Sequence, residues 1–357
     1  MLRSFRYLLF PVSFIYGSII WLRNKLYDAN ILKSASFNFP IICVGNLAVG
    51  GTGKTPMTEY LIRLLKDNYK TATISRGYKR KTKGYGLAGS GTTALDIGDE
   101  PMQFHKKFPG ISVAVGEERI VAIPQLLQDR PETEVIILDD ALQHRAVKAG
   151  LNILLTDYGN LYTRDFMLPA GDLRDKRSSA SRADIIIVTK CPHNISTDKK
   201  TAVIKELTPL PHQTIYFTEV QYSMPYHLFN KQTFNMGSHT DVLLITGIAN
   251  PKPLKDFLTS HVHTYEMLRY PDHHIFDSDD LKDIKKHFDK IQSTEKIILT
   301  TEKDGVRLQK FDTELSGMPV YVIPVQHHFL FDEAEKFNAQ VKAYIEAFRH
   351  KATVNTA

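Results

Sequence analysis

Cysteine is almost absent from this sequence, which has only two, Cys43 and Cys191, in 357 residues. That number excludes a fold held together by disulfide bonds and favours a reducing compartment. The sequence also has no internal repeat and no long low-complexity segment, which excludes solenoid architectures. With 43% hydrophobic and 24% charged residues, the chain has a globular composition, and its length predicts two domains.

A long hydrophobic run is also lacking. The longest candidate, residues 7–22, has 16 residues without charge, is broken by Pro11 and Gly17, and is shorter than the about 20 residues of a spanning helix. No small-residue cleavage site follows it, which argues against a signal peptide. We expect an interfacial membrane anchor, and a helix packed on the protein's own core is the alternative. The flanking cations are Arg3, Arg6, Arg23 and Lys25.

Neither charge sign is strongly in excess, since the formal net charge is +6. A modest positive charge suits nucleic acid, an anionic membrane surface or a phosphorylated substrate. The sequence has no RNA- or DNA-binding motif with aromatic residues for base stacking. We therefore expect no nucleic-acid partner, and a nucleic-acid-dependent ATPase is an alternative that salt-sensitive binding would reveal.

What the sequence does contain is a glycine-rich segment between an apolar strand and a helix. Residues 41–44 are typical of a buried parallel strand, and residues 57–65 fit a helix. The glycines expose backbone N–H groups, Lys54 can reach the β- and γ-phosphates, and Thr55 can bind Mg²⁺. This P-loop departs from G-x-x-x-x-G-K-[ST] at its first position. Its predicted nucleotide-binding residues are Ala48, Val49, Gly50, Gly51, Thr52, Gly53, Lys54 and Thr55.

Strands alternate with helices along the chain. The predicted strands are Ile41–Val44, Thr71–Ser75, Val135–Leu138, Asn152–Thr156 and Asp184–Val188. This alternation predicts an α/β fold, with a P-loop NTPase-type parallel sheet covered by helices on both faces. Segments 214–222 and 319–326 bracket a second, smaller α/β domain and could pair as a hinge. The predicted parts are an N-terminal membrane-association helix (1–28), a P-loop kinase core (29–213), the smaller domain with a two-stranded hinge (214–330), and a C-terminal helix and tail (331–357).

Two adjacent carboxylates, Asp139 and Asp140, end the predicted strand that begins at Val135. In P-loop enzymes such a strand end places an aspartate beside the Mg²⁺ that the P-loop threonine holds. The other carboxylate could contact Lys54 or the substrate. A strand-end turn or a helix N-cap is the simpler interpretation, and the sequence does not decide which aspartate meets the metal.

Two polar turns offer groups for acid–base chemistry. Asp99 could accept a proton from a hydroxyl, although it could also cap a helix. Asp272 precedes two imidazoles, His273 and His274, and a histidine polarised by a carboxylate fits a general base better than a zinc site does.

Basic side chains follow other predicted strands. Arg76 comes directly after the strand at residues 71–75, and Arg174 lies in a polar loop with further cations behind it. Both could bind anionic phosphate, and a solvated basic face is the simpler interpretation for the second. A turn at residues 300–304 follows another strand and offers a possible nucleotide contact.

Taken in order, these motifs resemble those of the lipid A 4′-kinase family, the membrane-associated tetraacyldisaccharide 4′-kinases of Gram-negative bacteria. Ala141, Asp172 and Asp175 stand where that family commonly has Gly, Pro and Glu, which bears on the loop shape near the substrate. The segments that carry the resemblance are residues 45–56, Ser75–Tyr78, Gly98–Pro101, Asp139–His144, Leu168–Arg174, Gly247–Pro251, Pro271–His273 and Thr301–Asp304.

The resemblance implies that ATP with Mg²⁺ phosphorylates the 4′-hydroxyl of a tetraacylated glucosamine disaccharide 1-phosphate, a step of lipid A biosynthesis. It implies that Asp99, helped by His273, activates the hydroxyl, and that the two would meet when the domains close. The neighbouring His274 leaves the choice of catalytic imidazole open, although the position in the motif favours His273. Such a lipid substrate and cytosolic ATP place the enzyme on the cytoplasmic face of the inner membrane. The expected catalytic and metal residues are Lys54, Asp99, His273, Thr55, Asp139 and Asp140, and the expected substrate contacts are Arg76, Gln143, His144 and Arg174.

A P-loop GTPase or ATPase switch, or a kinase for a different acceptor, is the alternative. Thr189 and Lys190 follow a strand as the guanine-specificity motif N-K-x-D does, but Thr189 and Pro192 occupy its Asn and Asp positions. The sequence leaves open the acyl-chain preference, the oligomeric state, and whether residues 7–22 span the membrane or lie on it.

Overall fold

The computed structural model describes residues 6–354 and divides into two compact units. Unit 1 contains Met1–Val220 and His327–Ala357, and unit 2 contains Gln221–Gln326. Arg3, one of the cations expected beside the anchor, and residues 355–357 of the expected tail lie outside the described residues. The chain leaves unit 1 once and returns to it once, so unit 2 is an insertion.

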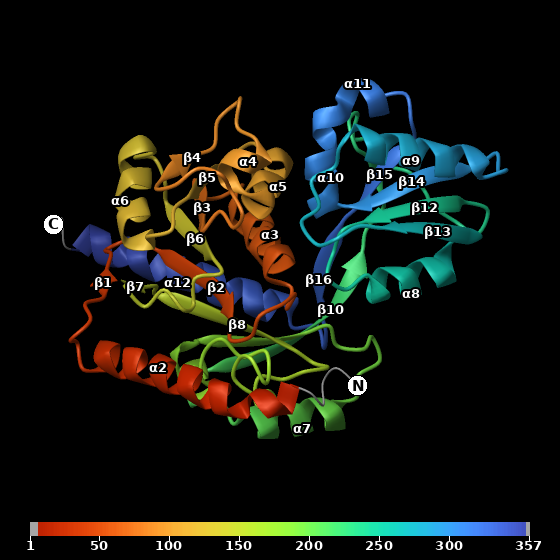
Figure 1. Cartoon of the computed structure of the whole chain (residues 1–357). Helices are drawn as coiled ribbons and strands as arrows, with labels where there is room; N and C mark the ends of the chain where they lie inside the picture. The colour runs from red at the N-terminus through yellow and green to blue at the C-terminus, as the bar shows by residue number, and fades with distance from the viewer. Residues whose placement is uncertain (1–5, 355–357) are drawn as a thin grey trace. The chain divides into compact units, whose positions relative to one another are not determined.

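Unit 1 is built on a nine-stranded sheet in the order β16-β10-β9-β8-β2-β6-β3-β5-β4 (Figure 1). Its predicted strands are all present, and β2 pairs in parallel with both β6 and β8, which confirms a parallel α/β sheet. Its strands are β2 (Ile41–Asn46), β3 (Thr71–Ser75), β4 (Gly86–Leu87), β5 (Ser112–Val115), β6 (Val135–Asp139), β8 (Leu151–Asp157), β9 (Ile185–Thr189), β10 (Thr214–Tyr222) and β16 (Val325–Phe329), with β1 (Ala35–Ser36) and β7 (Val147–Lys148) paired beside it.

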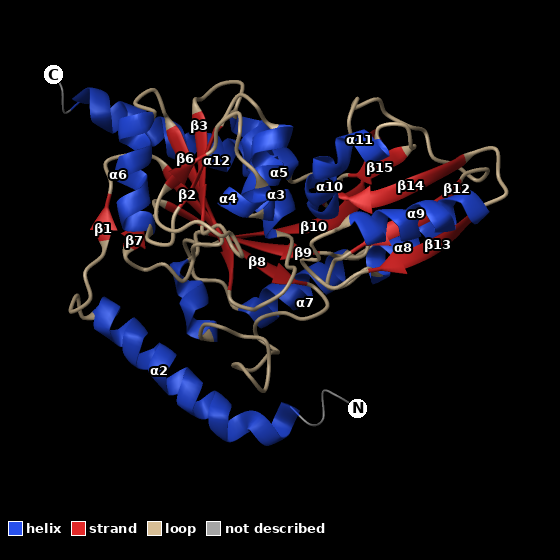
Figure 2. Cartoon of the chain, turned by 45° about the horizontal axis from the view of Figure 1, so that its top comes forward, coloured by secondary structure: helices blue, strands red, loops and turns tan. Residues whose placement is uncertain are grey.

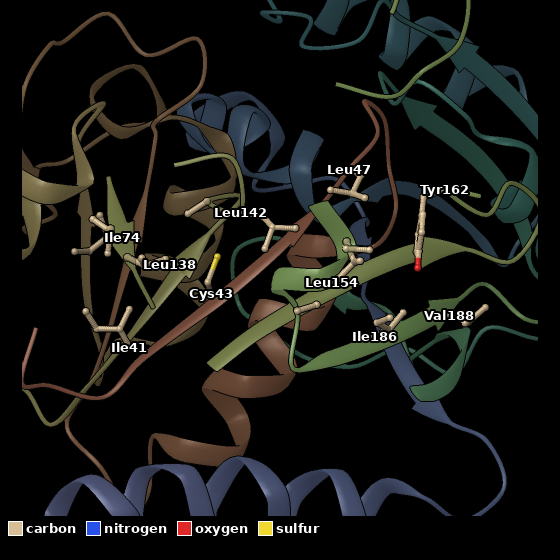
Figure 3. Packing of buried hydrophobic residues seen from close by; sticks show 14 of the residues in the cluster. Ile41, Cys43, Leu47, Ile74, Leu138, Leu142, Leu154, Tyr162, Ile186 and Val188 are labelled. Atoms are coloured by element: carbon tan, nitrogen blue, oxygen red, sulfur yellow. The ribbon is translucent and has the colours of Figure 1, made fainter. Parts of the chain in front are cut away.

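Helices cover both faces of this sheet. Alternate side chains of β2 point to opposite faces, and Ile41 and Cys43 join the core under α6 and α7 (Figure 3). On the other face α3 packs against α12, where Tyr60 contacts Phe337 and Asn338. The helices are α3 (Lys54–Leu65), α4 (Ala94–Ile97), α5 (Asp99–Lys107), α6 (Arg119–Asp129), α7 (Thr197–Leu207) and α12 (Ala334–Val354), with the 3-10 helix η2 (Arg177–Arg182).

The apolar N-terminal run forms α2 (Phe10–Asp28), preceded by the 3-10 helix η1 (Tyr7–Leu9). Pro11 lies in the first turn, where its missing N–H costs nothing. The helix lies at the rim of unit 1, beyond the loops that follow β8 (Figure 2). Tyr16 donates a hydrogen bond to the Arg174 carbonyl, and Asn24 donates to Asp175. No helix among the described residues has the length and apolar content needed to cross a bilayer.

Unit 2 has a five-stranded sheet in the order β11-β15-β14-β12-β13, in which β14 pairs in parallel with β12 and β15. Its core has a cluster on each face, one under α9 and one under α8. The elements are β11 (Tyr226–His227), β12 (Asp241–Thr246), α8 (Lys252–His261), β13 (Thr264–Arg269), α9 (Ser278–Lys290), β14 (Lys296–Thr301), α10 (Glu302–Leu308), η3 (Gln309–Phe311), α11 (Asp312–Leu315) and β15 (Val320–Ile323).

The expectations differ from the structure at three places. Segment 319–326 is not one extended segment, because Pro324, which has no N–H to donate, separates β15 in the unit 2 sheet from β16, which pairs with β10. In the expected C-terminal helix and tail (331–357), the helix extends from Ala334 to Val354 and takes up most of the expected tail. Strand β5, between β3 and β4, was not predicted.

Candidate functional site

The candidate site lies where three neighbouring strands of unit 1 end. Val44 of β2 is in register with Asp139 of β6, and β6 pairs with β3, which ends at Ser75. Because the strands are parallel, their carboxyl ends lie at one edge of the sheet, where α/β proteins bind ligands. The glycine-rich loop therefore emerges beside the paired aspartates.

The helix after the glycine-rich loop begins without a side-chain cap. Gly53 is the N-cap of α3, with a left-handed φ of 88°, and no side chain accepts a hydrogen bond from the first turn. Gly50 and Gly51 are exposed, and a Cβ at either would meet nothing within 4 Å. The first N–H groups of α3 are thus open to an anion from outside.

Two side chains that the sequence analysis missed hold this loop from behind. Thr189, at the end of β9, donates a hydrogen bond of 2.9 Å to the Thr52 carbonyl. His327, on β16, has Nε2 at 2.8 Å from the Gly53 carbonyl and Nδ1 at 3.0 Å from the Thr218 hydroxyl. Burial lowers the pKa of His327 to about 4, so the ring is neutral and donates through Nε2.

The close approach of His327 also explains Gly53. A Cβ on this residue would lie 2.8 Å from the imidazole ring, in addition to the strain of its positive φ. A glycine here was predicted from the P-loop pattern alone, and the structure shows a packing reason for it.

Lys54 is the first residue of α3 and lies 3.7 Å from Asp140. Arg174 binds the same carboxylate with both terminal nitrogens, and its Nη2 also donates to the Asn46 side chain at 2.6 Å. Burial alone would raise the pKa of Asp140, but Lys54 and Arg174 outweigh it and lower that pKa. Asp140 is therefore an ionised carboxylate shared by two cations.

Asp139 is in a different environment from its neighbour. Among the described residues, its carboxylate accepts hydrogen bonds only from hydroxyls, those of Thr58 at 3.2 Å and Ser75 at 3.5 Å. Burial and the charge of Asp140 raise its pKa to about 6. An ionised carboxylate that is buried without a direct cation partner favours binding of a positive charge.

The two aspartates differ in whether they can still bind Mg²⁺. Asp139 has unused acceptor capacity and a raised pKa that a bound cation would lower, while the oxygens of Asp140 are engaged by Lys54 and Arg174. Thr55, next to Lys54, supplies a hydroxyl of the type that P-loop enzymes use. Within residues 6–354, no cluster of three or more His, Cys, Asp or Glu residues could hold a metal. The residues therefore fit a magnesium ion that keeps waters and nucleotide oxygens as most of its ligands.

Arg119 is a further functional candidate that the sequence analysis missed. It is the first residue of α6, only 1% exposed, and its Nη1 donates to the Gly116 carbonyl. Its Nε and Nη2 are buried and have no hydrogen-bond partner among the described residues. Burial lowers its pKa to about 10, against the opposing effect of Asp139 and Asp140. A buried guanidinium with unused donors beside this site fits an anionic ligand.

Asp99 is the first residue of α5 and is buried. The alternative that Asp99 is a helix N-cap is wrong, because Gly98 is the N-cap of α5. Gly98 has a φ of 91°, and a Cβ there would lie 3.1 Å from the Tyr78 carbonyl, so the segment packs closely on Ser75–Tyr78. Buried Glu59 of α3 fixes α5 from the other side by accepting hydrogen bonds from the side chains of Gln103 and Lys107.

The four expected substrate contacts fall into two pairs, one bonded within the protein and one near the strand ends. Gln143 and Arg174 are occupied within the protein, since Gln143 donates 2.6 Å to the Asn46 carbonyl. His144 is half-buried, and its pKa falls to about 4 through burial and through the charges of Arg119, Arg76 and Arg23. The exposed Arg76 therefore lies close enough to His144 to favour its neutral form.

In unit 2 the two candidate imidazoles have different partners. His274 Nε2 lies 2.7 Å from Asp280, and the ring stacks on Tyr270, which is a structural environment. His273 has a left-handed φ of 65°, with Nδ1 at 2.9 Å from Arg307 and Nε2 at 3.1 Å from Lys303. A neutral imidazole has one lone pair, so it can accept from only one of these two cations.

The turn at residues 300–304 closes on itself. Thr301 is the N-cap of α10 and accepts a hydrogen bond from the Asp304 N–H, while its hydroxyl donates to the Asp304 carboxylate. Asp304, which is fully buried, also accepts from the Gly247 N–H at 3.0 Å. The carboxylate thus joins two loops of unit 2.

The chain is similar to a known protein family and to named relatives over nearly its whole length. Residues 5–346 match the family model described as tetraacyldisaccharide-1-P 4′-kinase. A protein of Bacteroides thetaiotaomicron named tetraacyldisaccharide 4′-kinase is 45% identical over 352 residues, with 94% of this chain and 92% of that protein covered. A protein of the same name from Porphyromonas gingivalis is 40% identical over 350 residues, with 96% and 97% covered.

A solved structure agrees with these relatives. LpxK from Aquifex aeolicus, an "apo" form in complex with ATP, has a TM-score of 0.75 and 28% sequence identity. The match covers 97% of this chain and 100% of that chain. The similarity therefore extends through both units.

Proposed function

The chain belongs to the tetraacyldisaccharide-1-P 4′-kinase family, as its motifs predicted, and we propose that it phosphorylates the 4′-hydroxyl of a tetraacylated disaccharide 1-phosphate with ATP. This reaction belongs to lipid A biosynthesis. The observation that carries the proposal is the uncapped start of α3, with Lys54, Asp139 and Arg119 around it. Open N–H groups and buried cations suit the triphosphate that a kinase must hold.

The glycine-rich loop acts as a P-loop in this proposal. Lys54 contacts the β- and γ-phosphates, and its position depends on Asp140, which Arg174 holds in turn. Arg119 offers its two unused nitrogens to the transferring phosphoryl group. Thr55 and Asp139 would hold Mg²⁺, while Asp140 stays paired with Lys54 and Arg174. When bound, the metal neutralises charge on the phosphate oxygens.

Asp99 is the proposed general base for the acceptor hydroxyl. Asp99 begins α5, and the preceding Gly98 packs closely against Gly77 and the Tyr78 carbonyl, just after the end of β3. His273 is proposed to assist Asp99 by holding or relaying the proton. Release of His273 from Arg307 or Lys303 would free a ring nitrogen for this role.

The acceptor headgroup is proposed to bind along the segment that follows Asp140. His144 and Arg76 contact it directly, as a neutral imidazole and an exposed guanidinium. Gln143 and Arg174 act mainly as positioning residues, because their donors already hold Asn46 and Asp140.

The outer face of α2 is the proposed membrane contact. Leu8 of η1 and Phe14, Ile15 and Ile19 of α2 are 61–78% exposed, although the inner face of α2 is hydrogen-bonded to the rest of unit 1. A row of exposed apolar residues on a helix with flanking cations suits insertion into one leaflet. We propose that the enzyme lies on the cytoplasmic face of the inner membrane, where ATP and the lipid meet.

Mass spectrometry tests the proposal. Purified protein is incubated with ATP, Mg²⁺ and the tetraacyl disaccharide 1-phosphate, and we expect a lipid product heavier by one phosphoryl group. ATP or GTP hydrolysis without a phosphorylated acceptor would instead support a nucleotide-dependent switch.

A further inference from the structure

Glu59 of α3 is a buried carboxylate that binds side chains of a second helix. Its Oε1 accepts a hydrogen bond of 2.8 Å from Gln103, and its Oε2 accepts one of 2.6 Å from Lys107. Both of these donors belong to α5. Arg63, one turn further along α3, also donates to Oε2, at 3.2 Å. We refer to these contacts between α3 and α5 as the Glu59 bridge.

The two joined helices lie side by side and run in the same direction (Figure 1, Figure 2). Glu59 meets Gln103, and four residues later on α3 the Arg63 guanidinium lies 5.9 Å from the centre of the Phe108 ring, at the end of α5. The contacts thus advance together along both helices. Their starts therefore lie on the same side of the Glu59 bridge.

The two helix starts carry the parts of the proposed reaction. Thr55 is four residues before Glu59, and Asp99 is four residues before Gln103. Residues four apart share a face of a helix, and the rise of about 1.5 Å per residue separates them by roughly 6 Å along the axis. The Glu59 bridge is therefore one turn away from the P-loop threonine and from the proposed general base.

Charges at the two starts act on one another. Burial lowers the pKa of Lys54, and the negative charges of Asp140, Asp139 and Glu100 oppose this effect. Burial and the charge of Asp140 raise the pKa of Asp139, and the charge of Glu100 adds to that rise. Because Glu100 is the second residue of α5, these effects place the start of α5 close to the phosphate-binding end of α3.

Neither helix start is fixed by a side-chain cap. The N-caps are Gly53 for α3 and Gly98 for α5, and no side chain caps either first turn. The alignment of the two starts therefore depends on contacts further along the helices, of which the Glu59 bridge is the buried and charged one. A buried ion pair adds little net stability over apolar residues of the same volume, but its hydrogen bonds are directional.

We propose that Glu59 is a positioning residue for phosphoryl transfer, because the Glu59 bridge fixes Asp99 relative to the glycine-rich loop. This role rests on the proposed function, in which Asp99 is the general base. Glu59 itself contacts neither ATP nor the acceptor in this proposal. A shift of about 1 Å in a reacting group can lower a rate about 10²-fold, so a small loosening of α5 against α3 is enough to slow the reaction.

Steady-state kinetics of lipid phosphorylation tests this role with Glu59→Gln, which removes the charge and keeps the shape. The kcat should fall about 10- to 50-fold, while KM for ATP should change less than about twofold, because α5 carries no proposed ATP contact. Adding Gln103→Glu to Glu59→Gln exchanges the carboxylate and the amide between the two helices, and should recover most of kcat.

Two adjacent lysines of α5 provide a matched pair of variants. Lys107→Met removes one hydrogen bond of the Glu59 bridge and should lower kcat about threefold. Lys106→Met removes the same charge from an exposed position and should leave kcat unchanged. Similar rates for the two variants would contradict a specific role of the bridge.

A double-mutant cycle with Asp99→Asn separates positioning from a general loss of structure. With the base already removed, Glu59→Gln should lower kcat by less than about twofold, because no carboxylate is left to misplace. A loss of folded protein would instead lower the rate by the same factor in both backgrounds. Thermal melts of all variants identify any that unfold at the assay temperature.

Three results would overturn the role of Glu59. They are an unchanged kcat in Glu59→Gln, the same loss of kcat with and without Asp99→Asn, and a raised KM for ATP with unchanged kcat. If Glu59→Gln does not fold, the cycle with Lys107→Met decides by the same criteria. Near-normal turnover of Asp99→Asn would refute the base assignment and this role with it, whereas absence of phosphorylated lipid with wild type would refute the proposed function itself.

Discussion

Each unit of the molecule contains a buried parallel strand that leads into a helix, in unit 1 through the glycine-rich loop, but the two helix starts are opposite in kind. In unit 2, the Thr301 hydroxyl accepts a hydrogen bond from the Asp304 N–H at the start of α10, and the Asp304 carboxylate binds the Thr301 hydroxyl and the Gly247 N–H. In unit 1, Gly53 offers no side chain to the start of α3. The same architecture therefore has one closed and one open helix start.

The difference shows where an anion can bind. A helix start that its own side chains satisfy has little to offer a phosphate, whereas an uncapped start retains unsatisfied N–H groups and the positive end of the helix dipole. The polar residues around α10 stabilise unit 2, and those around α3 point to a ligand. The predictions below test this contrast.

The largest effect is expected from Asp99, the first residue of α5. Asp99→Asn should lower turnover by about 10² to 10⁴-fold, because the amide cannot accept the acceptor proton, and should leave stability nearly unchanged. Product formation by mass spectrometry and a thermal melt measure the two properties. Near-normal turnover would show that Asp99 is not the base.

Lys54→Ala should lower turnover by roughly 10² to 10³-fold, because one charge that stabilises the transferred phosphoryl group is lost. The matched control is Lys66→Ala, directly after the last turn of the same helix, where the lysine pairs with exposed Asp67. Initial rates of phosphorylated lipid measure both variants. Similar losses in the two would contradict a specific role for the open end of α3.

Asp304→Ala should affect stability instead of chemistry. It leaves the buried N–H of Gly247 and the Thr301 hydroxyl without their acceptor, which should lower the free energy of unfolding by about 1–3 kcal/mol. Urea unfolding, monitored by circular dichroism of the backbone, measures this change. If Asp304→Ala kept its stability but lost ATP binding, the start of α10, and not that of α3, would be the nucleotide site.

A smaller effect is expected at His327, which holds the Gly53 carbonyl from behind. His327→Gln should raise the KM for ATP about fivefold, through loss of roughly 1 kcal/mol of hydrogen bonding to the loop, with a smaller effect on kcat. Initial rates at varied ATP separate the two constants. An unchanged KM for ATP would show that the loop does not need the hydrogen bond from His327 to the Gly53 carbonyl.

The same variant should change the pH dependence of stability. The pKa of His327 is lowered from its usual 6.5 to about 4 in the folded protein, so the unfolded chain binds more protons between those values. Stability therefore falls as the pH decreases from 6.5 to 4, and this contribution is absent above 6.5. Glutamine does not titrate, so the acid-side slope in His327→Gln should be shallower when melts are compared across this range.

Sequence predicted those parts of the site that are local in the chain. The strand, the glycine-rich loop and the start of α3 are contiguous, so their spacing alone indicated a phosphate site. Asp139 and Asp140 were found as a pair, but their different environments depend on Arg174, 34 residues beyond Asp140, and on Ser75. No local pattern contains that information.

The residues that sequence analysis missed are those whose role comes from the tertiary fold. His327 meets Gly53 across 274 positions because β16 returns from unit 2 beside β10. Arg119 begins an ordinary amphipathic helix, and its burial beside Asp139 follows from the position of α6 on the sheet. A lone arginine after Glu117 and Glu118 reads as part of an exposed charged turn. The one sequence signal for a role of Arg119 was its position at the start of a helix that follows a strand.

Amide hydrogen exchange with and without ATP and Mg²⁺ tests the contrast between the two helix starts most directly. We predict that nucleotide slows exchange at the N–H groups of residues 50–55, while residues 301–305, where the Thr301 hydroxyl caps the helix start, exchange as before. Protection at residues 301–305 with none at residues 50–55 would contradict the account, because it would place the phosphates at the closed helix start.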